Sequence, residues 1–302
     1  MTGSDLRGVA VNLRGVAVNL LGVVEHPCID ASPYRIDADG APYLPVGDGG
    51  LVLGVTLGDS VFAVSGDHVA PGACLVHPDD AARHALLLYS CIGNKAEVRT
   101  GPARGAAGAV IGKRGESGRL IVGFDPGDLA RMRPGDEVSV RGFGQGARPA
   151  WLPDVVTSMN IDPELLAALP VTATDSGVQV SVRSVIPSRL AGNGLGRPAA
   201  AWDLDLQLAA STAGGSGGSS PRASTDAPLL LGDLVAITDI DARYNMGYRR
   251  NWVTIGVIVH GASPLPGHGP GMTVILTGPD SALLAAEDGA SHTGLTASML
   301  MR

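Results

Sequence analysis

Apolar residues of this chain fall in short runs that alternate with clusters of glycine, aspartate and serine. Between residues 20 and 77 the turn signals are Asp-Gly, Gly-Asp-Gly-Gly, Gly-Asp-Ser and Ser-Gly-Asp. Short runs bounded in this way are typical of β-strands. We therefore predict strands at 20–25, 51–56, 60–64, 72–77 and 86–92, and later at 178–185, 233–237, 252–259 and 272–277.

Residues 96–145 combine glycine at regular intervals with apolar segments at 108–112, 119–124 and 138–142. Glycine inside a strand pattern marks bends and close backbone approaches. This region is therefore predicted to form a small barrel.

Helices are expected to be few and short. Asp162 and Pro163 form a helix start, because aspartate caps free amide groups and proline suits the first helical position. The sequence thus predicts a helix within 159–169, and shorter ones at 79–84, 126–131 and 280–286.

The predicted fold class is α+β, mainly β, with small curved or barrel-like sheets and a few short helices. Residues 1–155 would form an N-terminal β-rich subdomain that includes the barrel at 96–145. Residues 156–302 would form a C-terminal α+β subdomain, with a flexible insertion at 211–228 where the sequence is mostly Ser, Thr, Gly, Ala and Pro. The heptad LRGVAVN occurs twice, at 6–12 and 13–19, and the first dozen residues are expected to be loose.

Composition narrows the class of protein. The 302 residues are 45% hydrophobic, which excludes a disordered chain, and the net charge of −7 argues against a nucleic-acid partner. No run of 18 apolar residues and no signal-peptide pattern is present, so we expect a cytoplasmic protein with no membrane partner. Three widely spaced cysteines, Cys28, Cys74 and Cys91, indicate reduced thiols and argue against a cysteine-based structural zinc site.

Several motifs occur in a fixed order along most of the chain. They are GDHVAPG at 66–72, SCIGN at 90–94, GKRG at 112–115, MNIDP at 159–163, GDLVAI at 232–237, TIGVIVH at 254–260 and GHGPG at 267–271. In these motifs the chain resembles an uncharacterised prokaryotic family, domain of unknown function 4438, from about residue 51 to 277. The resemblance implies a β-rich fold in two closely packed parts and implies no activity. The chain departs from the family in its duplicated N-terminus, in the GGSGGSS segment at 214–220, and in carrying Arg114 where the family usually has histidine.

Histidines at strand ends are the first candidates for a site. His68 follows Asp67, which could orient it as a base or a metal ligand, although an aspartate after glycine is also a common turn residue. His260 ends a strand and is a candidate metal ligand, and His268 lies in the turn Gly267–Gly271. Backbone amides at Gly269 and Gly271 could bind an anion or stabilise an oxyanion, although glycine-rich turns are also common without a ligand.

The segment 239–250 carries a second set of polar residues. Asp239 and Asp241 share one side if the strand continues, so they could act as bases or metal ligands. Tyr244, Tyr248 and Arg249 could then bind substrate, with Arg249 neutralising its charge. The alternative is an exposed polar hairpin.

Residues near the predicted barrel offer a nucleophile and further contacts. Cys91 could be activated by His68, with Asn94 and Lys113 in contact with substrate, but a cysteine in an apolar run is usually a small apolar filler. Gly112–Gly115 lacks the Ser or Thr of a phosphate-binding loop, which favours a plain turn.

These residues favour an enzyme of hydrolase or lyase type that acts on a small polar or carboxylated molecule. Such an enzyme would suit specialised metabolism. A divalent metal could assist, and no nucleotide cofactor is expected because a dinucleotide-binding fingerprint is absent. An isomerase or cyclase could use the same groups, and a non-catalytic binding or oligomeric structural protein is the alternative class. The expected partners are a small-molecule substrate and further copies of the chain. The site is predicted where loops 67–72 and 91–95 meet loops 239–250 and 260–271.

Overall fold

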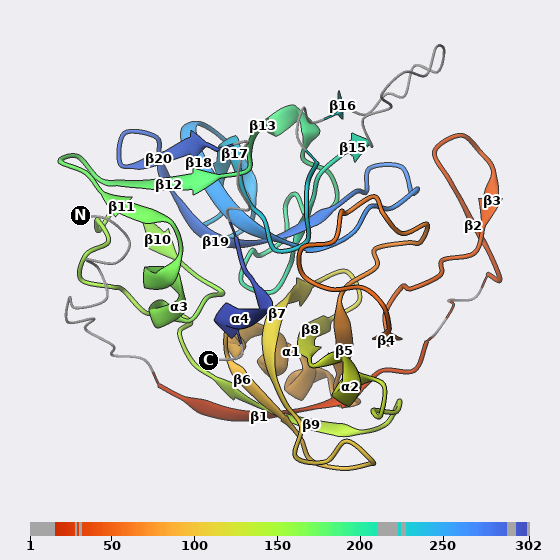
Figure 1. Ribbon diagram of the computed structural model, residues 1–302. Coiled ribbons are helices and arrows are strands. Elements are labelled where there is room, and N and C mark those ends of the chain that lie inside the picture. Colours follow the sequence, from red (N-terminus) through yellow and green to blue (C-terminus); the bar gives the residue numbers. More distant parts are fainter. Residues whose placement is uncertain are drawn as a thin grey trace.

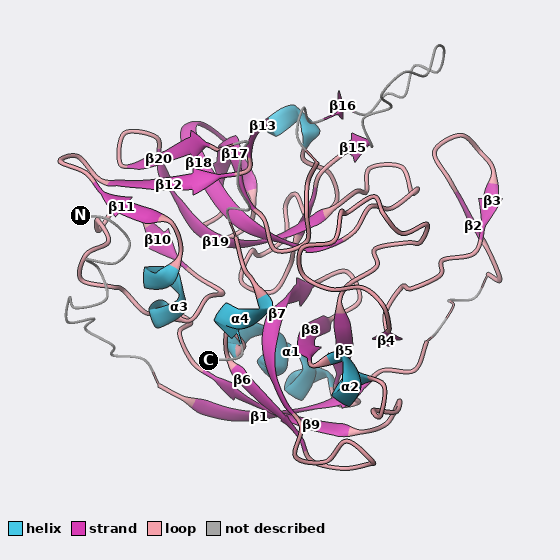
Figure 2. Ribbon diagram, viewed as in Figure 1, coloured by secondary structure: helices cyan, strands magenta, loops and turns pink. Residues whose placement is uncertain are grey.

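The computed structural model describes residues 16–27, 29, 32–209, 223–224, 228–288 and 294–300. The first heptad copy, the loose N-terminus, Cys28 and nearly all of the expected insertion at 211–228 lie outside these residues. The described chain is mainly β with short helices, as Figure 2 shows by the extent of the strands. None of the described helices is long and apolar enough to cross a membrane.

A closed barrel forms the N-terminal part of the protein, in the lower half of Figure 1. The strand order is β1 (Val18–Val24), β9 (Glu137–Gly142), β6 (Lys95–Val98), β7 (Ala107–Arg114), β8 (Arg119–Phe124), β5 (Gly72–Val76) and β4 (Leu51–Val52). β1 also pairs with β5, with Val23 opposite Val76, and this pairing closes the sheet. The predicted barrel at 96–145 was therefore too short, because β1 and β5 come from earlier in the chain.

One helix replaces a predicted strand. α1 (Asp80–Tyr89) begins after Asp79, whose side chain accepts a hydrogen bond from the amide of Ala82 at 2.8 Å. The helix was expected to end at 84 and a strand to follow at 86–92, and that strand prediction is wrong. Leu86 and Leu87 are buried while Leu88 and Tyr89 are exposed, so the apolar run is the inner face of a helix.

Long antiparallel strands form the C-terminal part. Its main sheet has the order β10 (Thr157–Ser158), β19 (Gly271–Pro279), β18 (Gly247–His260), β17 (Leu234–Asp241) and β13 (Ser184–Pro187), and β14 (Leu204–Asp205) also pairs with β19. A smaller sheet contains β11 (Val171–Ala173), β12 (Val178–Val182) and β20 (Leu283–Glu287). The helix predicted at 280–286 is wrong, because Leu283 is buried and opposite Val178 in a parallel pair.

Short elements complete the described chain. They are β2 (Arg35–Ile36), β3 (Pro42–Tyr43), α2 (Pro126–Leu129), α3 (Pro163–Ala168), a 3-10 turn η2 (Ser188–Leu190), β15 (Leu208–Ala209), β16 (Ala223–Ser224) and α4 (Ala297–Leu300). α3 confirms the helix start predicted at Asp162 and Pro163. The strand predicted at 60–64 is not formed, and only Ser60 makes an isolated bridge to Leu230.

Two of the buried apolar clusters contain residues of both parts. Ile111 and Ile121 of the barrel belong to the same buried cluster as Val257, Val259 and Ile275 of the main C-terminal sheet. Gly112 lies against Val259, and a Cβ atom at this glycine would overlap the valine side chain. This close crossing of β7 over β18 places Lys113, Arg114 and the loop that follows beside the end of β18.

Candidate metal centre

Three histidines and two aspartates from distant parts of the chain meet at the end of β18. His68 lies in the loop before β5, His260 is the last residue of β18, and His268 lies in the turn to β19. Asp203 and Asp205 come from the segment that contains β14. The ring centroid of His68 is 5.0 Å from that of His260 and 5.0 Å from that of His268, with both pairs edge to face.

Glycines allow the aspartate segment to approach the sheet. A Cβ atom at Gly115 would overlap Trp202, one at Gly194 would overlap the carbonyl of Asp203, and one at Gly269 would overlap the carbonyl of Leu206. Gly271 lies against the ring of His260. The structure thus gives Gly269 and Gly271 a packing role, as close-contact positions that orient their neighbours.

His68, Asp205 and His268 form the first group of possible metal ligands. His68 Nε2 is 3.0 Å from His268 Nδ1 and 3.4 Å from Asp205 Oδ2, and His268 Nδ1 is 2.9 Å from the same oxygen. This contact joins loop 67–72 to loop 260–271, two of the four loops that were predicted to meet. Donor atoms about 2.0–2.1 Å from a tetrahedral ion lie about 3.3–3.4 Å apart, so these three atoms are close to the spacing of a coordination triangle.

Asp203, Asp205 and His260 form the second group. His260 Nε2 is 2.7 Å from Asp203 Oδ2 and 3.4 Å from Asp205 Oδ1. Its other nitrogen, Nδ1, donates to the carbonyl of Gly261 at 2.9 Å. Burial would lower the pKa of His260, but the two carboxylates outweigh it and raise this pKa to about 10. Nε2 of His260 therefore carries a proton that lies between the ring and the two aspartates.

Asp67 orients the ring of His68 through Nδ1, the nitrogen on the side opposite to the one that faces Asp205 and His268. His68 Nδ1 lies 2.6 Å from Asp67 Oδ1, and Asp67 also accepts hydrogen bonds from Arg35, Tyr43 and Ser263 at 2.7–2.9 Å. Burial would raise the pKa of Asp67, but these partners hold it well below its usual range. With Nδ1 directed to Asp67, Nε2 of His68 faces Asp205 and His268, and a carboxylate behind the ring in this way is common for metal-binding histidines.

A network of arginines surrounds Asp48 next to the cluster. Arg114, Arg119 and Arg35 all pair with Asp48, and Arg119 also pairs with Glu25 at 2.6 Å. Arg114 Nη2 lies 3.2 Å from His68 Nδ1. These cations are thus occupied by Asp48, Asp67, Glu25 and Glu116, and in the described chain Asp203 and Asp205 form ion pairs with histidines only.

The cluster reaches the surface at His268 and Glu116. The side chain of His268 is 16% exposed and that of Glu116 is 41% exposed, and Glu116 Oε2 lies 3.9 Å from His268 Nδ1. The other four residues of the cluster are almost completely buried. Solvent therefore reaches the cluster mainly at His268 and Glu116.

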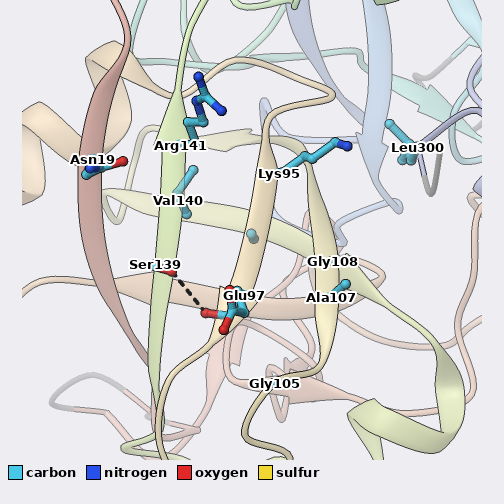
Figure 3. A pocket seen from close by; sticks show the side chains of 11 residues that line it. Asn19, Lys95, Glu97, Gly105, Ala107, Gly108, Ser139, Val140, Arg141 and Leu300 are labelled. Atoms are coloured by element: carbon cyan, nitrogen blue, oxygen red, sulfur yellow. Dashed lines mark hydrogen bonds between the residues drawn. The ribbon is translucent and has the colours of Figure 1, made fainter.

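A separate cavity of about 410 Å³ lies along the barrel strands β1, β9, β6 and β7. Figure 3 shows its charged lining, Lys95, Glu97 and Arg141, beside Leu300 of α4. It contains no residue of the histidine cluster. The candidate site is therefore identified by the spacing of its nitrogen and oxygen donor atoms and not by the size of a cavity.

The predicted site residues of segment 239–250 do not join the cluster. A bulge between Thr238 and Ile240 gives Asp239 a φ of 58° and turns its carboxylate to the amide of Asn251. Asp241 pairs with Arg243 and Arg249 at 2.7 and 3.0 Å. Both guanidinium groups lie over the ring of Trp252, at 4.2 and 4.1 Å from its centroid, and Tyr244 and Tyr248 are exposed.

This hairpin lies at the far end of β18 from His260. Gly247 begins the strand and His260 ends it. At about 3.3 Å per residue the two ends are on the order of 40 Å apart along the strand. The segment therefore has the features of an exposed polar hairpin, which was the alternative interpretation.

Asn94 and Lys113 have partners inside the protein. Asn94 Oδ1 accepts from the amides of Cys91 and Phe143, at 2.8 and 3.0 Å, which ties the loop to β9. Lys113 Nζ is fully buried and donates to Asn160 Oδ1 and to the carbonyl of Ala200. Burial lowers the pKa of Lys113 to about 8. Its contact with Ala200 attaches the segment before Asp203 to the barrel.

Cys91 is completely buried, and burial raises the pKa of its thiol to about 11. We expect Cys91→Ala to be more stable than Cys91→Ser in urea unfolding, because a buried hydroxyl without a good partner costs about 1–3 kcal/mol. Sγ lies 3.9 Å from Gln145 Oε1, too far for a strong hydroxyl bond from the same position. Equal stability of the two variants, with activity lost in both, would instead support a nucleophile.

Asp203 and Asp205 were missed by the sequence analysis, as was Glu116. The alternation Asp203-Leu204-Asp205-Leu206 could have indicated them, because alternate residues of a strand point to the same face. In the structure both leucines are completely buried, and both aspartates share the opposite face. The same two-residue spacing was noticed at Asp239 and Asp241. The two pairs differ in their surroundings: a bulge turns Asp239 away from Asp241, whereas close packing places Asp203 and Asp205 beside the histidines.

Two family models match the chain. Those described as domain of unknown function DUF4438, N-terminal, and DUF4438, C-terminal, match residues 34–167 and 168–293. A solved structure described as "Crystal structure of TM1086" is similar, with 34% sequence identity and a TM-score of 0.83 over 93% of this chain and 95% of that chain. No curated protein gives a significant match.

Proposed function

Since the chain belongs to the DUF4438 family, whose description names no activity, we propose from the site itself that it is a metal-dependent enzyme of hydrolase or lyase type. Its substrate would be a small polar or carboxylated molecule. The ion would be held by His68 Nε2, Asp205 Oδ2 and His268 Nδ1.

The convergence of these three atoms carries the proposal. They come from residues 68, 205 and 268 and lie 2.9–3.4 Å from one another. Two nitrogen atoms this close repel unless a proton or a cation lies between them. Asp67 already directs Nε2 of His68 into the cluster, and a metal ligand requires this preorganisation.

Two imidazoles and one carboxylate suit zinc or a neighbouring first-row divalent ion. Three protein ligands leave a coordination position open, as in catalytic zinc sites and unlike structural ones. Such an ion activates water or polarises a carbonyl or carboxylate oxygen of a substrate. This chemistry supports a polar or carboxylated substrate.

Glu116 is the candidate general base or acid. Its carboxylate lies beside His268 at the exposed side of the cluster, where a substrate would enter. Arg114 Nη2, 3.4 Å from Glu116 Oε2, would fix the direction of that carboxylate. A general acid or base must lie within hydrogen-bond reach of the reacting atom. Glu116 suits this role because its carboxylate is partly exposed and lies beside the proposed ligand His268.

Metal retention tests the proposal. The full chain, loaded with Zn²⁺ and desalted, should keep zinc by elemental analysis, and His268→Ala should lose at least one equivalent while keeping its circular dichroism spectrum. His84→Ala is the matched control, because His84 is exposed on α1 away from the cluster.

Activity is measured on a panel of small esters, amides, lactones and hydroxy acids. Turnover should require metal and should be lost in His268→Ala and reduced in Glu116→Gln, because the first holds the ion and the second moves a proton. A wild-type chain that retains no zinc, or equal retention in His268→Ala, would refute the metal site. Retained zinc without turnover on any substrate would favour a non-catalytic binding protein.

A further inference from the structure

The two oxygens of Asp205 face two different sets of ligands. Oδ2 lies 2.9 Å from His268 Nδ1 and 3.4 Å from His68 Nε2. Oδ1 lies 3.4 Å from His260 Nε2. A carboxylate placed between two sets of donors in this way has the geometry of a bridging ligand.

We propose that the cluster is a dinuclear metal centre, in which Asp205 bridges the ion described above and a second divalent ion held by Asp203 Oδ2 and His260 Nε2. This inference rests on the proposed function and extends it. Two-ion centres with a separation of about 3.5–4 Å occur in phosphatases, nucleases and aminopeptidases, so of the two reaction types proposed above the inference favours hydrolysis.

The second set is oriented by contacts on its outer side. Asp203 Oδ1 accepts from the amide of Gly115 at 2.9 Å, which leaves Oδ2 directed to His260. His260 Nδ1 is occupied by the carbonyl of Gly261, which leaves Nε2 directed to the aspartates. Each ligand thus has one atom bound to the protein backbone and one atom directed to the same point, as in the outer shell of known metal sites.

Gly271 supports the ring of His260. A Cβ atom at this position would overlap Nε2, Cε1 and Cδ2 together, so the glycine backbone packs against the imidazole and leaves no room for a side chain. The ring can therefore adopt the observed orientation only beside glycine. Gly271→Ala should displace His260 without removing any donor atom.

The two buried carboxylates of the cluster are a further argument for bound cations. Asp203 and Asp205 are buried side by side, and among the described residues their ion-pair partners are His68, His260 and His268. Paired buried carboxylates repel each other unless protons or cations lie between them. The neighbouring arginines are already paired with Asp48, Asp67, Glu25 and Glu116. Divalent ions bound by these side chains would place positive charge between the two carboxylates in exchange for the protons that the histidines carry there.

Metal stoichiometry of the full chain tests the inference. The protein is stripped with a chelator, dialysed and titrated with Zn²⁺ alone, by calorimetry and by elemental analysis after desalting. Wild type and the control His84→Ala should bind two equivalents. His260→Ala and Gly271→Ala should each bind one, His268→Ala should bind one, and Asp205→Asn should bind less than one.

The outcomes separate this inference from the proposed function. One equivalent in wild type, lost in His268→Ala and kept in His260→Ala, would overturn the second ion and leave the proposed function standing. No bound zinc in wild type would overturn both. Two equivalents in both His260→Ala and Gly271→Ala would also overturn the second site.

A spectroscopic measurement supports the test if His260→Ala fails to fold. Co²⁺-loaded wild type should show magnetically coupled ions, because a carboxylate bridge holds them within about 4 Å. Gly271→Ala, which keeps every donor atom, should show one uncoupled ion. Two uncoupled ions in wild type would contradict a shared Asp205.

Discussion

Removal of bound divalent metal should lower the melting temperature of the full chain by about 10 °C. A ligand at a free concentration 1,000 times its Kd stabilises the folded state by about 4.1 kcal/mol. For chains of about 150–250 residues, 1 kcal/mol changes the melting temperature by about 2–4 °C, and this chain is somewhat longer. The effect arises because the ion replaces protons between buried carboxylates and imidazoles.

Thermal unfolding with Zn²⁺ and with excess chelator measures this difference. Asp205→Asn is the informative variant, because it removes charge from both ligand groups while keeping the shape of the side chain. Its melting temperature should not respond to Zn²⁺. An equal response of wild type and Asp205→Asn would assign the stabilisation to ions bound elsewhere.

Asp48→Asn should reduce the free energy of unfolding by about 3–5 kcal/mol, the range seen when one partner of a buried ion pair is removed. Asp48 is buried and pairs with Arg114, Arg119 and Arg35. Two of these guanidinium groups are themselves buried, so the substitution leaves positive charge without a partner. Urea unfolding at neutral pH measures the loss.

Asp80→Asn is the matched control. Asp80 pairs with Arg83 on the surface of α1, and its side chain is 78% exposed. Exposed pairs contribute about 0–1 kcal/mol, so this variant should unfold almost like wild type. Equal losses in the two variants would mean that the Asp48 network adds no more than a surface pair.

The pH dependence of this network has a defined sign. Burial would raise the pKa of Asp48, but Arg114 and Arg119 outweigh it and lower the pKa below its ordinary value. The stabilisation is therefore complete above the unfolded pKa, about 3.9, and is lost as the pH falls through the lowered folded value. Asp48→Asn should remove this part of the acid sensitivity.

Local chemistry made several elements predictable. Asp162 and Pro163 begin α3 because capping and fixed φ act within one turn of the chain. The strands 234–241, 247–260 and 271–279 coincide with apolar runs and are buried over most of their length. Their positions could therefore be predicted from the pattern of apolar residues along the chain. His68 and His268 were identified because each is a polar ring beside the glycine-containing turns of the sequence, His68 after Gly66-Asp67 and His268 within Gly267–Gly271.

Other elements depend on partners far away in the sequence. Leu86–Ile92 reads equally well as a strand or as the inner face of a helix, and burial of Leu86 against Leu75 and Gly22 of the barrel decides for the helix. Residues 283–287 form a strand because β12, a hundred residues earlier, offers a parallel edge. A short window cannot distinguish these alternatives.

The amino-acid sequence by itself determined a mainly β chain and the start of α3, and it marked His68 and His268 as candidate site residues. Tertiary structure alone decided which carboxylates meet them. Asp239 and Asp241 have the spacing of a site, but a bulge turns Asp239 away and two arginines hold Asp241 on an exposed hairpin. Asp203 and Asp205 have the same spacing, and Gly115, Gly194 and Gly269 let their backbone approach close enough to place both carboxylates among the histidines. Close approach depends on the absence of side chains at positions distant in sequence, and spacing along one strand cannot reveal it.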